Sequence, residues 1–261
     1  MEKLRLYILI TIVITLCLQF ACSTVDATDQ TTKTSVSPPT AAEFDQAAVL
    51  FAQREDISKL RDAISILEKH RGPGKRSFEV EWKFAKYSYF LGKLSTDASE
   101  AEAAFTNGRD AGKIASELDP NKPNGHFWFG ANLGELAKIN MITVGIPSIG
   151  SIKETMHKVI EIQPTYQNSS AYDVLAQVEL ETRLYGGKAE NAVELLETAL
   201  MDESENMNLH LNLAKAYLAV KRDSDAKKEL DKLISMKPDP DYMPEYKICV
   251  EAAKKLLSTK F

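Results

Sequence analysis

The side chains that most often carry out catalysis are sparse and scattered in this sequence. None of its four histidines has a second metal-ligand residue at the spacing of a zinc site; they are His70, His126, His157 and His210. No GxSxG, Walker A or HExxH motif occurs. Ser148 lies in the segment GIPSIG, but no strand-turn-helix pattern surrounds it, so we interpret it as a loop serine. The sequence therefore predicts a protein that is not an enzyme and that needs no cofactor and no metal.

The first 22 residues have the pattern of a signal or lipoprotein leader. Two basic residues among the first five precede the apolar run LYILITIVITLCLQFAC, and the chain turns polar at Ser23. Cys22 follows Ala21, where a bacterial lipid-modified cysteine would stand, although Gln19 occupies a lipobox position that is usually aliphatic. Three outcomes stay open: lipidation of Cys22, cleavage by an ordinary signal peptidase after Ser23 or Ala27, and retention as an N-terminal anchor.

Cysteine chemistry is limited in the same way. A processed chain would keep only Cys22 and Cys249, so lipidation of Cys22 would leave no partner for a disulfide. Cys249 stands between Ile248 and Val250 in an apolar helical stretch. We expect it to be a small buried side chain and not a nucleophile.

Residues 23–40 and 41–261 differ in composition. The first segment, STVDATDQTTKTSVSPPT, is rich in Ser, Thr and Pro and almost free of large apolar residues, which predicts a disordered tether. The second has enough apolar residues for a continuous core and is expected to form the folded domain. The formal net charge of −5 argues against nucleic acid as a main partner, because phosphate binding requires clustered Lys and Arg.

Apolar residues recur at helical spacing along residues 41–261, and glycine or proline interrupts them at intervals. This pattern predicts five helix hairpins, followed by a helix after Pro244. The hairpins are expected at residues 41–70, 80–118, 121–164, 170–204 and 207–238. A single hairpin cannot bury its own apolar stripe, whereas stacked hairpins bury it between neighbours. We therefore predict an all-α, TPR-like solenoid whose last helix caps the core.

Two hairpins carry more specific expectations. In the third, Asn124 can cap the first helix, a loop runs through Gly150, and the second helix opens near Ser151 and stops before Pro164. In the second, the glycines at positions 108 and 112 are four residues apart on a charged helix, which indicates close helix packing.

The fifth hairpin shows the tetratricopeptide pattern most clearly. It has small and aromatic residues on its first helix, Ala214 and Tyr217, then Ala226 on its second helix, and Pro238 at its end. The nominal period of this repeat is about 34 residues. The small residues allow the two helix backbones to approach each other.

Longer blocks add a resemblance to a particular family. The segments AEFDQAAVLFAQREDISKLRDAISILEKH, HFWFGANLGELAKIN, IKETMHKVIEIQPTY and LYGGKAENAVELLETAL resemble the TatT-like lipoproteins, the TPR-type T component associated with TRAP transporters. A related helical family, the regulators of microtubule dynamics, shares a block similar to FWFGANLGELA. The leader favours the periplasmic family. The chain departs from that family's pattern in having no proline just before the Gly186-Gly187 turn.

The resemblance implies a periplasm-facing, membrane-anchored lipoprotein and a homo-oligomer. Such a protein would assist a periplasmic substrate-binding protein and its transporter permease, and would pass on a small organic ligand without chemistry. A secreted or periplasmic soluble form remains an alternative. Two further alternatives are a general envelope TPR scaffold that binds a peptide or helix, and a peptidoglycan or outer-membrane assembly factor.

Candidate groove residues lie on the first helix of each hairpin, away from its packing stripe. In TPR stacks these positions line the concave face. The candidates are Phe127, Trp128, Ala131, Asn132, Glu135, Asp173, Gln177 and Lys215, with Glu181, Asn208 and Leu211 at related positions. Lys153 and Tyr185 are additional candidates outside these first helices. Trp128 has an alternative place in the core, and Asn132 requires a hydrogen-bond partner from either the backbone or a ligand.

Overall fold

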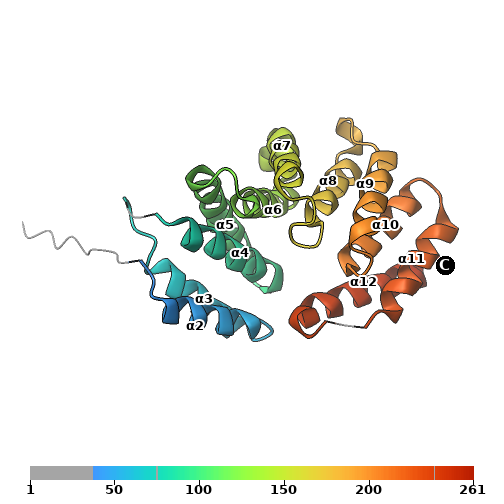
Figure 1. Ribbon diagram of the computed structural model, residues 1–261. Coiled ribbons are helices and arrows are strands. Elements are labelled where there is room, and N and C mark those ends of the chain that lie inside the picture. The colour runs from blue at the N-terminus through green and yellow to red at the C-terminus, as the bar shows by residue number, and fades with distance from the viewer. Residues whose placement is uncertain (1–37, 75, 238) are drawn as a thin grey trace, which may run out of the picture. The chain divides into compact units, whose positions relative to one another are not determined.

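The computed structural model describes residues 38–74, 76–237 and 239–261, all within one compact unit (Figure 1). The predicted leader, most of the predicted tether and Pro238 lie outside the described residues. The described residues contain α-helices with short 3₁₀ and π turns and no strands. Among these helices, none combines the length and the apolar character needed to cross a bilayer.

Five helix hairpins follow one another, and a single helix completes the unit, as predicted. The hairpins are α2 (Ala41–Ala52) with α3 (Ile57–Glu68), α4 (Phe78–Leu94) with α5 (Ala98–Leu118), α6 (Pro123–Ile139) with α7 (Ile146–Ile162), α8 (Ser170–Glu181) with α9 (Ala189–Asp202), and α10 (Met207–Ala219) with α11 (Asp223–Ser235); the final helix is α12 (Met243–Lys260). We call the first helix of each hairpin its A helix. From α4 onward, each A helix packs against the next A helix, and α12 packs against α10.

Capping residues and glycines set several helix ends. Thr40 and Glu43 form a capping box at the start of α2, and Asp97 accepts two backbone hydrogen bonds at the start of α5. The fourth hairpin turns at Gly186, whose φ of +98° is in the left-handed region that glycine tolerates. These local signals explain why the hairpins could be predicted from the sequence.

The predicted details of the third hairpin are wrong at two points. Asn124 does not cap α6: the helix begins at Pro123, its N-cap is Lys122, and Asn124 lies inside the first turn. Proline suits the first helical position because it has no N–H to leave unpaired there. The expected loop through Gly150 is instead a π-helical turn, Met141–Gly145, that continues directly into α7. Pro147 lies in the first turn of α7, where it starts the helix instead of breaking it. The end of α7 before Pro164 is confirmed.

Two apolar clusters form the core. The first spans α2 to α8 and includes Phe84, Trp128 and Met156; the second spans α8 to α12 and includes Leu196 and Leu213. Cys249 is buried in the second cluster, as expected, and its thiol donates to Asn208 Oδ1 at 3.2 Å. Burial raises the pKa of this thiol to about 11, so the thiolate nucleophile is scarce at neutral pH.

Candidate functional site

A continuous chain of polar side chains crosses four successive A helices. Lys93 of α4 contacts Glu135 of α6 at 3.4 Å, and Lys138 donates to Glu135 at 3.0 Å and to Gln177 of α8 at 2.9 Å. The chain continues through Asp173, Asn212 and Lys215, with distances of 2.8 Å from Gln177 to Asp173, 2.7 Å from Asn212 to Asp173, and 2.9 Å from Lys215 to Asn212. We call these seven residues the polar chain.

The polar chain combines buried and exposed side chains. Asp173 is buried, and burial raises the pKa of its carboxyl group although Asn212 and Gln177 donate to it. Burial also acts to raise the pKa of Glu135, but Lys93 and Lys138 outweigh it and hold that pKa below its ordinary value. Lys215 is exposed, yet desolvation lowers the pKa of its amine.

The structure brings together four of the predicted groove residues. Glu135, Asp173, Gln177 and Lys215 all belong to the polar chain. Four others are buried in the core between helices and are not available to a ligand, which corrects their assignment to the groove. These are Phe127, Trp128, Ala131 and Asn132, with exposed fractions of 5%, 2%, 6% and 0%. The A helix turns these positions toward the neighbouring helices and not toward solvent.

The side-chain amide of Asn132 makes its hydrogen bonds within the protein. Its side-chain amide donates to the backbone oxygens of Ala85, at 3.2 Å, and Trp128, at 2.7 Å, so it ties α6 to α4. Its Oδ1 atom is buried and has no hydrogen-bond partner among the described residues. The backbone alternative weighed from the sequence is therefore the one observed.

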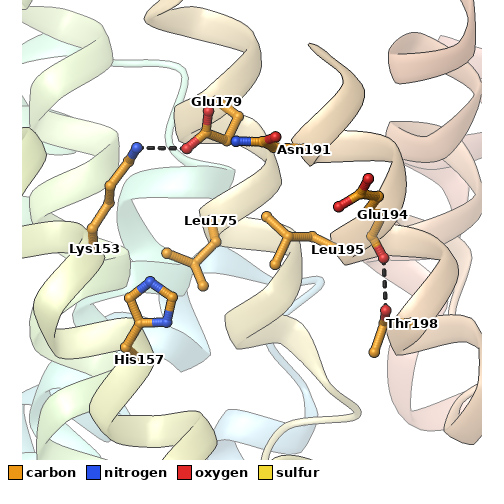
Figure 2. A pocket seen from close by; sticks show the side chains of 8 residues that line it. All are labelled: Lys153, His157, Leu175, Glu179, Asn191, Glu194, Leu195 and Thr198. Carbon is orange, nitrogen blue, oxygen red and sulfur yellow. Dashed lines mark hydrogen bonds and ion pairs between the residues drawn. The ribbon is translucent and has the colours of Figure 1, made fainter. Parts of the chain in front are cut away.

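Lys153 belongs to a different feature, the α7–α9 pocket of about 460 Å³ (Figure 2). Its amine lies 2.5 Å from Glu179, which also accepts from the backbone N–H of Lys188 at 2.8 Å. Figure 2 shows Leu175 and Leu195 in the middle of the pocket, between Lys153 on one side and Glu194 and Thr198 on the other. The other lining residues are His157, Asn191, Glu194 and Thr198. Both carboxylate oxygens of Glu179 thus have partners within the protein. The pair of Lys153 and Glu179 joins α7 to α8.

Tyr185 stands apart from both features. It is 57% exposed in the 3₁₀ turn between α8 and α9. The described residues also hold no group of three His, Cys, Asp or Glu side chains arranged as metal ligands. The chemistry that the polar chain can perform is hydrogen bonding and charge pairing.

Sequence reasoning missed Lys93, Lys138 and Asn212. Their partners in neighbouring A helices lie one repeat away along the chain: Lys93 and Glu135 are 42 residues apart, and Lys138 and Gln177, like Asp173 and Asn212, are 39 apart. Comparison of residues about one repeat apart was therefore the signal that could have found them. The observed spacing exceeds the nominal repeat of about 34 residues.

Comparison with known proteins supports this architecture. The sequence profile of the family described as regulator of microtubule dynamics protein 1-3 matches residues 44–172, and a tetratricopeptide repeat profile matches residues 184–243. Regulator of microtubule dynamics protein 3 from Rattus norvegicus is 29% identical over 83 residues, which cover 32% of this chain and 18% of that protein. The chain thus matches less than a fifth of the length of this relative.

One solved structure shows the same fold. The TPR protein TTC0263 from Thermus thermophilus superposes with a TM-score of 0.59 at 16% identity, over 82% of this chain and 100% of that one. MamA from Desulfovibrio magneticus RS-1 gives a TM-score of 0.49 at 13% identity, over 74% and 94% of the two chains. With its five hairpins and its final helix, the described unit is a tetratricopeptide-like helix-hairpin solenoid, a fold suited to protein–protein interaction.

Proposed function

We propose that this chain is a non-catalytic binding protein that holds a partner protein against the polar chain. The observation that carries this proposal is that the polar chain ends at Lys215, an exposed lysine that donates to the buried Asn212, which itself donates to the buried Asp173. Its ammonium group has three donors, and the described contacts use one of them, with Asn212. A partner that accepts the remaining hydrogen bonds binds where water is already partly excluded, which strengthens each contact.

The finer proposal concerns the identity of the partner. We propose a periplasmic substrate-binding protein that acts with a TRAP-type permease, and a membrane attachment through a lipid on Cys22. The leader pattern and the TatT-like sequence blocks support this proposal. The match to the regulators of microtubule dynamics agrees with the sequence block that this chain shares with them. The name of that family points to a microtubule-associated alternative. An envelope scaffold for other proteins is the second candidate, because the same polar chain would serve it.

The partner can be identified by crosslinking the full chain in cells and purifying it from native membranes. Recovery of a substrate-binding protein together with an integral permease is the result expected for a transport accessory. Recovery of cell-wall or outer-membrane assembly proteins would overturn the transport proposal and favour the scaffold. The crosslinked bands would also report whether the chain forms a homo-oligomer.

The role of the polar chain can be tested with Lys215→Ala. This exposed side chain is not part of the apolar core, so we expect the melting temperature to stay near that of the parent protein. Loss of one hydrogen bond from a charged donor costs about 1.5–3 kcal/mol in binding, and partner recovery should fall about tenfold or more. Quantitative mass spectrometry of the crosslinked partner measures this change.

A matched control separates the site from general surface charge. Lys227 is also an exposed lysine of the fifth hairpin, but it lies on α11 and pairs with Asp231 at 2.7 Å. Lys227→Ala should leave partner recovery unchanged. Equal recovery with Lys215→Ala and Lys227→Ala would remove the polar chain from the binding site.

A further inference from the structure

The first hairpin and the last helix of the described unit touch each other through side chains. Arg54, in the turn between α2 and α3, donates to both carboxylate oxygens of Glu245 of α12, at 3.0 and 2.9 Å, and to the backbone oxygen of Asp241 at 2.5 Å. Figure 1 shows this turn beside the start of α12. Because the repeats of a solenoid contact mainly their neighbours along the chain, a contact between its first and last elements is an additional restraint on its shape.

Arg54 is buried although it is charged. Its exposed fraction is 4%, and its Cζ atom lies 4.9 Å from the ring centre of Phe51 and 5.2 Å from that of Phe90. The two rings cover the guanidinium group, while Glu245 and the oxygen of Asp241 accept its hydrogen bonds. A buried guanidinium that loses its carboxylate keeps an uncompensated charge, so the pair is strongly favoured over a dry separation of its members.

Little else joins the first hairpin to α12. Within the described residues, α12 packs mainly against α10 and α11, and the first hairpin packs mainly against α4. A second ion pair, between Lys247 and Glu55, also connects α12 to the α2–α3 turn, but both of its side chains are more than half exposed. Exposed pairs contribute little to stability. The closure between the two ends therefore depends chiefly on Arg54 and Glu245.

The core divides at a place where a hinge could act. The first apolar cluster spans α2 to α8 and the second spans α8 to α12, and the neighbouring residues Leu175 and Ala176 of α8 belong to different clusters. We call α2–α7 the first lobe and α9–α12 the second lobe. Arg54 lies in the first lobe and Glu245 in the second. Small rotations between the helices next to α8 would separate these two side chains and leave each cluster intact.

We propose that Arg54 and Glu245 form a latch that holds the two lobes closed, and that the lobes open about α8 when this pair breaks. The latch itself requires no partner. Its consequence for the polar chain rests on the proposed function: Lys93 lies in the first lobe and Lys215 in the second, so opening changes the spacing of the groups that would contact a partner protein.

The test measures the distance between spin labels on α3 and α12 in the full chain. The labels are attached to azide-bearing amino acids at the exposed positions of Ser65 and Ser258, so the native cysteines stay unchanged. We expect a single narrow distance distribution for the parent protein. Arg54→Met removes the charge and keeps a long apolar side chain, and it should lengthen and broaden the distribution. An unchanged distribution in this variant, with its helical circular dichroism retained, would overturn the proposal.

Two further variants separate the latch from general effects of charge or folding. Lys247→Ala removes the exposed ion pair of the same helix, and the distance should stay that of the parent protein. Glu245→Met breaks the latch from the second lobe, and it should lengthen the distance as Arg54→Met does. A distance that Lys247→Ala lengthens equally, or that Glu245→Met leaves in place, contradicts the latch. No partner takes part in these measurements, so their outcome is independent of the binding test with Lys215→Ala.

Discussion

Replacing Glu81 by alanine should lower the free energy of unfolding by about 3–5 kcal/mol. This carboxylate is fully buried near the start of α4, with an exposed fraction of 0%. Arg71 donates to one of its oxygens at 3.0 Å, and Arg76 donates to the other at 2.7 Å. Arg71 also lies over the ring of Phe84, with its Cζ atom 3.7 Å from the ring centre. Removal of Glu81 leaves the half-buried Arg71 charge without its carboxylate, in addition to the lost hydrogen bonds.

Urea denaturation of Glu81→Ala and of Asp231→Ala provides the comparison. Asp231 also pairs with a basic side chain, Lys227 at 2.7 Å, but both partners are about half exposed. Exposed pairs contribute about 0–1 kcal/mol, so Asp231→Ala should unfold close to the parent protein. If the two variants lost similar stability, the buried carboxylate would contribute no more than a surface ion pair, and the link between the α3–α4 turn and α4 would lie in apolar packing alone.

The helix pairs of this fold could be predicted from local sequence patterns. The repeated apolar spacing predicted the paired helices. Gly186 marks the turn inside the fourth pair, and the segment RGPGK at 71–75 marks the break between the first pair and the second. The same rules failed between α6 and α7. Pro147 and Gly150 suggest a loop in isolation, but the backbone closes a π-helical turn there, in which the N–H of Gly145 donates to the Asn140 oxygen at 3.0 Å. The local pattern of proline and glycine does not reveal this turn.

The candidate site was only partly predictable for a physical reason. The place of a residue along an A helix shows whether its side chain faces the core or solvent only when the rotation of that helix is known. An error of one residue turns a side chain by about 100°, so Phe127 and Ala131 were assigned to the groove while Lys138 was missed. The ion pair between Arg54, which follows α2, and Glu245 of α12 joins residues that are 191 positions apart in the sequence. No local pattern predicts such a pair.

Replacing Gly112 by alanine should destabilise the protein by about 3 kcal/mol, although alanine favours helices more than glycine does. A Cβ atom at this position in α5 would lie 2.4 Å from the backbone nitrogen of Phe129 and 2.9 Å from the backbone carbon of Trp128. Backbone atoms cannot rotate away as a side chain can, so α6 would have to move. A Cβ atom at Gly108, one turn earlier, would lie 2.3 Å from the side-chain oxygen Oδ1 of the buried Asn132. The close packing predicted from this glycine spacing is thus confirmed.

Gly134→Ala is the matched control, because Gly134 is a glycine inside α6 and a Cβ atom there meets nothing within 4 Å. It should stabilise the protein by about 1 kcal/mol through helix propensity alone. Thermal denaturation should therefore move the melting temperatures of the two variants in opposite directions. A stabilising effect of Gly112→Ala would show that α5 and α6 can separate at little cost. The polar contact between Asn140, which follows α6, and Glu102 of α5 would then have to tolerate that separation. The opposite shifts are expected because one glycine allows two backbones to touch, whereas the other only leaves a helix without a side chain.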